Sequence, residues 1–321
     1  MNQYAVELHS HTNHSDGDFT VDELHQQALE YGYDGLILTD HNTASGYKEL
    51  EERAEESRLV TLGGIEWTTY FGHMLVHDAK RLVDWRTAKP DTIDQHILEV
   101  KEAGGLVGIA HPYAVGSPMC TGCHWSFNVT NWDNVDYIEV WNSVSPDDQY
   151  WSWDAYSLWA GLLDRGTRIS CSAGRDWHRK EPMEENPAIT YVETEGPLIK
   201  SSFRGALEQG AFYITLGPSL DWAIEQNGRY VRMGETLKAG QGQLQLSVLP
   251  VMNKTLRKFA PKVERVKVIH NGKVCVDEQV EEETVSVPLE LAPGYVRVEL
   301  WGTIKGKSNE LLTISNPIYI D

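Results

Sequence analysis

The sequence predicts an α/β protein with a smaller all-β part at its C-terminal end. Over the first two thirds of the 321 residues, short apolar strand-like segments alternate with amphipathic helical segments. This alternation is typical of parallel strands with helices outside, arranged as either a barrel or an open sheet. Near Gly217 and Pro218 the helical segments stop, and only strand and turn signals follow. Polar side chains that can bind metal follow several of the earlier strands, which indicates a site at one edge of the sheet.

The helices are predicted from apolar residues that recur three and four positions apart. The first follows Thr20, an expected N-cap with Glu23 three positions on, which is the spacing of a capping box. The third ends at Gly104 and Gly105, a typical helix stop. The predicted helical segments are Val21–Leu29, Gly46–Ser57, Thr92–Ala103, Trp151–Leu163 and Phe203–Gln209.

The strands are predicted from short runs rich in apolar residues. In the first part these runs are Tyr4–Leu8, Gly35–Thr39, Leu59–Trp67, Met74–His77, Leu106–Ala110, Tyr137–Trp141 and Arg168–Ser172. In the last part they are Leu220–Gln226, Gln243–Pro250, Val263–His270, Glu283–Leu289 and Gly294–Leu300. Asn227-Gly228 and Asn271-Gly272 are typical of hairpin turns. We therefore expect a small β-sandwich-like domain over residues 218–321.

The composition predicts an ordinary soluble protein, with 41% hydrophobic and 23% charged residues. No apolar run reaches the roughly 18 residues of a membrane span. The net charge of −19 argues against a nucleic-acid polymer as partner, while metal ions at one site could still admit a small phosphorylated molecule. With four cysteines and no recognisable secretory signal, we expect a reduced, cytoplasmic protein. Edge strands in the β part could pair between chains, so a homo-oligomer is an open option.

The most informative segment holds His9, His11 and Asp16. Two histidines two positions apart, just after a strand, point the same way and can hold one metal ion. Further candidate ligands follow the other strands: His41, Glu66, His73, His111, Asp176 and His178. Because parallel strands end at one edge of a sheet, these residues can converge although they are far apart in the chain. Asp40 either orients an imidazole or caps the next helix.

These motifs resemble the PHP (polymerase and histidinol phosphatase) superfamily over roughly residues 5–180. The resemblance is carried by the His-x-His pair with Ser-Asp-Gly, by Thr-Asp-His, by the strand-end Glu, and by Gly-His, Ala-His-Pro and Asp-x-His. The segment that ends at Pro218, followed by a β part, is similar to the branch that includes a carbaryl hydrolase and a microcin-maturation protein. The resemblance implies a distorted (β/α)7 barrel over residues 1–217, with residues 218–321 as an accessory β-sandwich-like domain.

The resemblance also implies two or three divalent metal ions. The implied ligands are His9, His11, Glu66 and Asp176 for the first ion, Glu66, His73 and His111 for the second, and Asp16, His41 and His178 for the third. Glu66 would bridge the first two ions. Imidazole and carboxylate ligands suit Zn, Fe or Mn and do not choose between them. The residues implied to be catalytic through these ions are His9, His11, Glu66, His111 and Asp176.

Two arginines near the last motif are candidates for binding the substrate. Arg175 stands where many relatives have Ser, and its guanidinium could bind a phosphate or carboxylate, or equally pair with an acidic neighbour. Arg179 could line the same mouth or lie in an exposed basic turn. We therefore keep both residues as candidate substrate-binding residues.

The resemblance implies a metal-dependent hydrolase, and a phosphomonoesterase is the leading hypothesis. A hydroxide bridging two ions would attack phosphorus while the third ion holds non-bridging oxygens. A carbamate, ester or amide hydrolase on the same metal site is the alternative hypothesis. A non-catalytic, metal-bearing interaction module is the second alternative.

Overall fold

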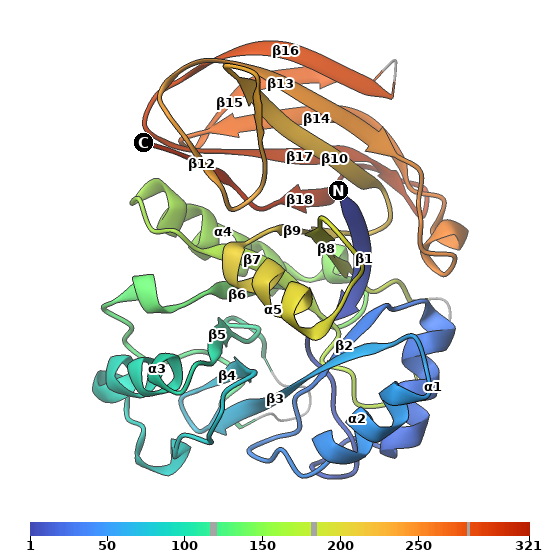
Figure 1. Cartoon of the computed structure of the whole chain (residues 1–321), viewed down its shortest axis with the longest axis vertical. Coiled ribbons are helices and arrows are strands. Elements are labelled where there is room, and N and C mark those ends of the chain that lie inside the picture. The colour runs from blue at the N-terminus through green and yellow to red at the C-terminus, as the bar shows by residue number, and fades with distance from the viewer. Residues whose placement is uncertain (116–120, 181–184, 281–282) are drawn as a thin grey trace.

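Two parts of different composition lie one above the other in the structure (Figure 1). The computed structural model describes residues 1–115, 121–180, 185–280 and 283–321. Residues 1–217 contain the long helices and a mixed sheet, and the remaining chain is built almost entirely of strands. This confirms the sequence-based expectation of an α/β part followed by a β-rich part. Cys120, the first residue of the run Cys120-Thr-Gly-Cys123, lies outside the described residues. Cys123 is disulfide-bonded, which differs from the expectation of reduced cysteines.

The α/β part has its five predicted helices, with bounds shifted by a few residues. They are α1 Val21–Tyr31, α2 Tyr47–Glu55, α3 Ile93–Glu102, α4 Tyr150–Asp164 and α5 Lys200–Gln209. The capping box of α1 is present, because Thr20 Oγ1 accepts from the Glu23 N–H at 3.2 Å and the Glu23 carboxylate accepts from the Thr20 N–H at 2.8 Å. Within the described ranges, no helix combines the length and apolarity needed to cross a membrane.

The strands of the α/β part form one mixed sheet. They are β1 Asn2–Glu7, β2 Gly35–Leu38, β3 Val60–Thr69, β4 Gly72–His77, β5 Leu106–Ile109, β6 Tyr137–Asn142, β7 Ser170–Gly174, β8 Ile189–Thr194 and β9 Phe212–Thr215. Their order is β9-β8-β1-β2-β3-β4-β5-β6-β7. β1, β2 and β3 are parallel, and so are β5, β6 and β7. β4 runs antiparallel to both of its neighbours, because β3 turns back directly into it.

The sheet curls so that its last strand, β7, comes to lie beside β8. No β7–β8 ladder is present among the described residues, and a side chain joins the two strands instead. The Ala173 N–H donates to Thr190 Oγ1 at 3.1 Å, and the Thr190 hydroxyl donates to the Ala173 carbonyl at 2.9 Å. With an antiparallel β4 and no ladder between β7 and β8 among the described residues, the order of strands and helices is less regular than a (β/α)7 repeat. β8 and β9 were not predicted from the sequence, although both are short runs of the kind that predicted the other strands.

The strands of the β-rich part belong to two sheets, one of which continues into the α/β part. Its strands are β10 Ser219–Gln226, β11 Arg229–Val231, β12 Thr236–Leu237, β13 Gly240–Leu249, β14 Lys262–His270, β15 Lys273–Gln279, β16 Thr284–Leu291, β17 Gly294–Ile304, β18 Lys307–Ser315 and β19 Ile318–Ile320. One sheet has the order β11-β10-β13-β16, and the other holds β12, β19, β17, β18, β14 and β15. The hairpin turns at Asn227-Gly228 and Asn271-Gly272 are confirmed, with φ between 49° and 80° at all four residues.

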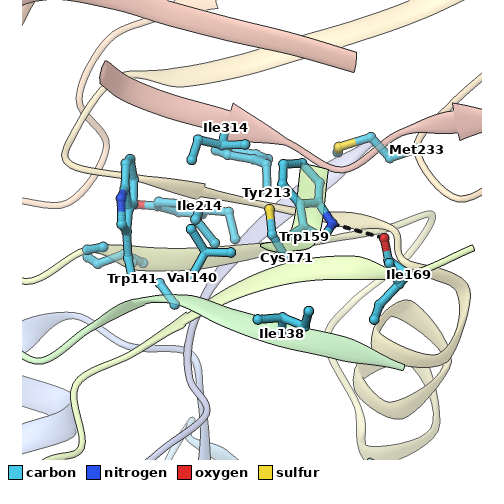
Figure 2. Close-up of a cluster of buried hydrophobic side chains, with 14 of the residues drawn as sticks. Ile138, Val140, Trp141, Trp159, Ile169, Cys171, Tyr213, Ile214, Met233 and Ile314 are labelled. Carbon is cyan, nitrogen blue, oxygen red and sulfur yellow. Dashed lines mark hydrogen bonds between the residues drawn. The ribbon is translucent and has the colours of Figure 1, made fainter. Parts of the chain in front are cut away.

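The two parts share one sheet and one apolar core. β18 pairs with β9, with Thr313 opposite Thr215, so the strand ladder continues across the expected boundary at residues 217 and 218. Figure 2 shows buried side chains of both parts together, with Ile314 of β18 next to residues of β6, β7, β9 and α4. Trp159 of α4 is fully buried there, and its indole N–H donates to the Ile169 carbonyl at 3.0 Å.

We expect the free energy of unfolding to fall less with rising pH in Glu193→Gln, a variant of β8, than in the wild type. Glu193 is buried, it accepts from Gln3 Nε2 at 3.0 Å, and Arg232 lies 3.8 Å away. Burial raises the pKa of this carboxyl from 4.5 to about 7, against the opposing charge of Arg232. Between those pH values the folded chain keeps a proton that the unfolded chain loses. The free energy of unfolding therefore falls as pH rises through that window, by about 3 kcal/mol in all.

Urea unfolding of wild type and variant between pH 4.5 and 8 measures this contribution. The difference between the two curves isolates Glu193 from the other titrating groups. Equal pH dependence in both proteins would show that Glu193 stays ionised in the folded state.

Candidate metal centre

Nine side chains singled out in the sequence converge at one end of the curled sheet. They are His9 and His11 after β1, Asp16 before α1, His41 after β2, Glu66 in β3, His73 in β4, His111 after β5, and Asp176 and His178 after β7. The ligand atoms of eight of them form three overlapping groups, each with all atoms within 4.8 Å of one another: His9, His11, Glu66 and Asp176; His11, Asp16, His41 and His178; and His41, Glu66 and His73. His111 belongs to none of these groups, although its Nε2 lies 3.1 Å from Oε1 of Glu66. Each of these groups could hold a metal ion.

Glu66 lies at the middle of these groups and is fully buried. Its Oε2 atom is 2.8 Å from Nδ1 of His41, 3.3 Å from Nε2 of His9 and 3.4 Å from Nε2 of His11. Its Oε1 atom is 2.8 Å from Nδ1 of His73 and 3.1 Å from Nε2 of His111. The two oxygens thus face different sets of imidazoles, which is the geometry that a bridging carboxylate requires.

Asp176 is the second carboxylate of the group that contains His9, His11 and Glu66, which we call the inner group. Its Oδ1 atom is 3.1 Å from Nε2 of His11 and 3.2 Å from Nε2 of His9, and its Oδ2 atom is 3.8 Å from Nε2 of His111. The backbone of Asp176 is left-handed, with φ of 52°. Left-handed backbone also occurs at Asn42 and His111, which likewise follow strands of the sheet. A left-handed backbone costs free energy in a non-glycine residue. Its occurrence at three residues around one site indicates that the positions of the side chains there compensate for this cost.

The outer group of His11, Asp16, His41 and His178 is more exposed to solvent than the inner group, in which only Asp176 is partly exposed. Asp16 Oδ1 lies 3.2 Å from Nε2 of His178 and 3.4 Å from Nε2 of His41. The Asp16 side chain is 59% exposed and that of His178 is 30% exposed, while His9 and His11 are fully buried. A substrate would therefore approach from the side of Asp16 and His178. His41 stands between the groups, since its other ring nitrogen faces Glu66.

Buried polar atoms without partners support a cation at the centre. Nε2 of His9, both ring nitrogens of His11, Oε2 of Glu66 and Oδ1 of Asp176 have no hydrogen-bond partner among the described residues. Leaving such atoms unpaired in the interior is costly, and native proteins rarely do so. Nε2 of His9 and Nε2 of His11 each lie 3.1–3.4 Å from Oε2 of Glu66 and Oδ1 of Asp176, and this mixture of imidazole nitrogen and carboxylate oxygen fits Zn, Fe or Mn. The residues present therefore fit the ions that the sequence led us to expect.

The charges of the centre support the same conclusion. Burial disfavours the charged form of His9, but the carboxylates of Asp176, Glu139 and Glu66 raise its pKa well above the usual value. Burial would raise the pKa of Glu66, but the surrounding imidazoles hold that pKa well below its usual range. For His11, burial dominates and lowers the pKa to about 4. The buried carboxylates are thus ionised beside protonated imidazoles. Divalent cations would replace those protons as the positive partners of the carboxylates.

A second layer of contacts holds the candidate ligands in place, and the sequence analysis did not identify it. The backbone carbonyl of Thr121 is 2.9 Å from Nε2 of His73, and that of Cys123 is 3.2 Å from Nδ1 of His111. Glu139 Oε1 is 3.0 Å from Nδ1 of His9. A hydrogen bond to the second ring nitrogen fixes the orientation and tautomer of a metal-binding histidine. The one sequence signal for Glu139 is an acidic residue within an apolar strand.

Glu7 and Asp40 support the loops that carry the candidate ligands. Glu7 Oε1 accepts from the N–H groups of His9 at 3.0 Å and Arg175 at 2.9 Å, which ties the end of β1 to the end of β7. Asp40 accepts from the N–H and hydroxyl of Thr12, both at 2.7 Å. Asp40 therefore neither orients an imidazole nor caps α2, whose N-cap is Gly46. The sequence-based alternatives for Asp40 were both wrong, because its partner belongs to the preceding loop.

The two candidate substrate-binding arginines have different surroundings. Arg175 is fully buried, and its guanidinium stacks 3.8 Å from the ring centre of Trp177 and 4.1 Å from that of Tyr31. Such stacking favours a structural role, and its binding of substrate stays a prediction. Arg179 lines a cavity of about 670 Å³ together with Phe19 and residues of α1. None of the nine candidate ligands is among the described residues that line this cavity, and the link to the centre is the N–H of Asp18, which donates to the His178 carbonyl at 2.7 Å.

Comparison with known families finds a match within the N-terminal part of the chain. Residues 7–109 match the PHP domain family, which confirms the resemblance drawn from the sequence motifs for that segment. A curated relative from Eggerthella lenta, named phosphoribosyl 1,2-cyclic phosphate 1,2-diphosphodiesterase, is 34% identical over 64 residues. That match spans 20% of this chain and 24% of the relative's length.

Comparison with solved structures finds the same two-part arrangement. A two-domain protein from Bacteroides vulgatus, described as containing a predicted PHP-like metal-dependent phosphoesterase, superposes with a TM-score of 0.54 and 15% identity. The match covers 99% of this chain and 95% of that chain, so the likeness of fold extends through the β-rich part. An amidohydrolase from Chromobacterium violaceum covers 63% of this chain and 95% of its own, with 17% identity and a TM-score of 0.38, which is too low to carry weight.

We expect removal of divalent cations by a chelator to lower the melting temperature, and Zn, Fe or Mn to restore it. An ion that binds only the folded state stabilises it by about 2.7 kcal/mol at a hundredfold excess over its Kd. Thermal unfolding with and without each metal measures the effect. Asp176→Ala should abolish the gain, while His270→Ala, a histidine of β14 in the β-rich part, should retain it. An equal metal response in wild type and Asp176→Ala would place the bound ion elsewhere.

Proposed function

We propose that this protein is a metal-dependent hydrolase of the PHP type that cleaves phosphate esters, with phosphomonoesters as its first expected substrates. The observation that carries the proposal is the convergence of eight imidazole and carboxylate side chains around the buried Glu66. The PHP family match supports it, and both the relative and the solved structure described above have names that denote phosphoesterases.

The proposed centre has three ions, with Glu66 shared by two of them. His9, His11, Glu66 and Asp176 would hold the first ion, Glu66, His73 and His111 the second, and Asp16, His41 and His178 the third. Divalent ions in such a centre lower the pKa of water and offset the negative charge of a phosphoryl group. Zn, Fe and Mn all suit these ligands.

The surroundings of the centre suit a small substrate that enters from one side. The fully buried His9, His11 and Glu66 exclude water behind the reacting group, and the exposed Asp16 and His178 face the incoming molecule. We propose that the cavity lined by Arg179 takes the rest of a small substrate, since Asp18 in its wall is hydrogen-bonded to the His178 carbonyl. A net charge of −19 repels a nucleic-acid polymer, whereas the ions would attract a single phosphate group.

We infer that the curled sheet is the distorted barrel typical of PHP proteins, and that residues 218–321 form its accessory β domain. Support comes from the parallel strands on both sides of β4 and from the side-chain hydrogen bonds of Thr190 between β7 and β8. Self-association through the β domain and a cytoplasmic location stay predictions.

We expect His41→Ala and Asp176→Ala to reduce turnover to background while the fold survives. Each change removes one proposed ligand, and the remaining ligands would no longer hold all of the ions in place. The assay is release of inorganic phosphate from a panel of phosphomonoesters, including nucleotides, by protein loaded separately with Mn, Fe and Zn. His270→Ala serves as the matched histidine control.

Full activity in either ligand variant would overturn the proposed centre. Silence of the metal-loaded wild type would contradict the monoesterase proposal. Phosphodiesters would then be assayed, followed by carbon-centred esters, carbamates and amides. Strong inhibition by inorganic phosphate would indicate an enzyme that cleaves phosphate esters, and weak inhibition one that cleaves bonds to carbon. A metal-loaded protein inactive on all of these would favour the non-catalytic module.

A further inference from the structure

Glu139 is a buried acidic residue that none of the proposed ligand sets includes. It lies in the middle of β6, between Ile138 and Val140, and is 1% exposed. Burying a carboxylate is expensive unless it is paired and hydrogen-bonded. The position of Glu139 inside an apolar strand therefore calls for specific partners.

The carboxylate of Glu139 connects three segments of the metal centre. Oε1 lies 3.0 Å from Nδ1 of His9. Oε2 accepts from the backbone N–H of His111 at 3.0 Å and from Nδ2 of Asn142 at 2.9 Å. β6 and β1 are not neighbours in the sheet, so the contact with His9 crosses its concave side. One side chain thus links the ends of β1, β5 and β6.

Gly174 leaves the space that this contact needs. A Cβ atom at residue 174 would lie 2.2 Å from Oε1 of Glu139 and 2.6 Å from Cβ of His9. Gly174 is paired with Asn142 in the ladder between β6 and β7, so the backbone has little freedom to move away. Any larger residue at this position would separate Glu139 from His9.

We propose that Glu139 is a positioning residue that keeps the proton of His9 on Nδ1 and so aims Nε2 at the metal ions. This inference rests on the proposed metal centre. A carboxylate accepts the Nδ1–H group, and a neutral imidazole then offers its lone pair at Nε2. That atom lies 3.3 Å from Oε2 of Glu66 and 3.2 Å from Oδ1 of Asp176, and it has no hydrogen-bond partner among the described residues.

Glu139 also differs from the groups that orient His73 and His111. His73 and His111 are held by the backbone carbonyls of Thr121 and Cys123, which no substitution removes. The partner of His9 is a side chain, so its contribution can be measured directly. Loss of a charged group that orients a metal-binding histidine weakens metal binding by about 10–100-fold.

The test is the metal affinity of Glu139→Gln, measured by competition with a chromogenic chelator on metal-free protein. Glutamine keeps the size of the side chain and removes its charge. We expect affinity for the tightest ion to fall about 10–100-fold. Glu193→Gln, the same change at a buried carboxyl of β8, is the matched control and should bind metal as the wild type does. Unchanged affinity in Glu139→Gln would overturn the inference.

A second measurement uses the wild type alone and covers the case in which Glu139→Gln fails to fold. Histidine ¹⁵N spectra of the metal-loaded protein report which ring nitrogen of His9 carries hydrogen, with His9→Gln providing the assignment. Hydrogen on Nδ1 supports the inference, and hydrogen on Nε2 overturns it. A wild type that binds metal but cleaves no phosphate ester would refute the proposed function and leave this test intact, whereas a wild type that binds no metal would refute both.

Discussion

The buried carboxylate of Glu66 is the interaction on which the centre depends. Five imidazoles lie within 3.4 Å of its two oxygens, and they come from the ends of four different strands. β3 is long enough to bring Glu66 past the end of β2, where its N–H donates to the Thr39 carbonyl at 3.0 Å. Buried charges persist only when their partners are placed with this accuracy, since desolvation otherwise exceeds the electrostatic gain. The fold of the α/β part can therefore be understood as a means of holding these partners around one acidic side chain.

The support behind the ligands has two kinds of component. Backbone carbonyls of the segment after residue 120 hold His73 and His111, and acidic side chains hold the end of β1. Carbonyls are fixed by the course of the chain, whereas Glu7 and Glu139 depend on their own burial among apolar strands. The inner ligands are thereby immobilised, while Asp16 and His178 on the open side remain exposed. This division suits a centre whose buried ligands are rigid and whose exposed ligands are accessible to a substrate.

The sequence predicted those features that are encoded locally. The capping box at Thr20, the Asn-Gly hairpins and the ligand-rich strand ends depend on residues close in the chain, and all are present. The antiparallel direction of β4 could not be predicted, because the residues of an apolar run such as Met74–His77 do not show whether the strand is parallel or antiparallel to its neighbours. The burial of Arg175 depends on Tyr31, more than 140 positions away, and the partner of Glu139 is His9, 130 positions away. Such pairings arise from the curvature of the sheet, which no single segment encodes.

The pairing of β18 with β9 has a consequence for how the chain unfolds. A fragment that ended at residue 217 would keep β9 but lose its antiparallel neighbour, and it would lose Ile314 and Met233 from the shared core of Figure 2. An open strand edge above an uncovered apolar surface is prone to aggregate and contributes little stability. The two parts are distinct in architecture and yet share one strand ladder and one apolar core. The last strands of the chain must be synthesised before the centre that lies near its beginning can gain its full rigidity.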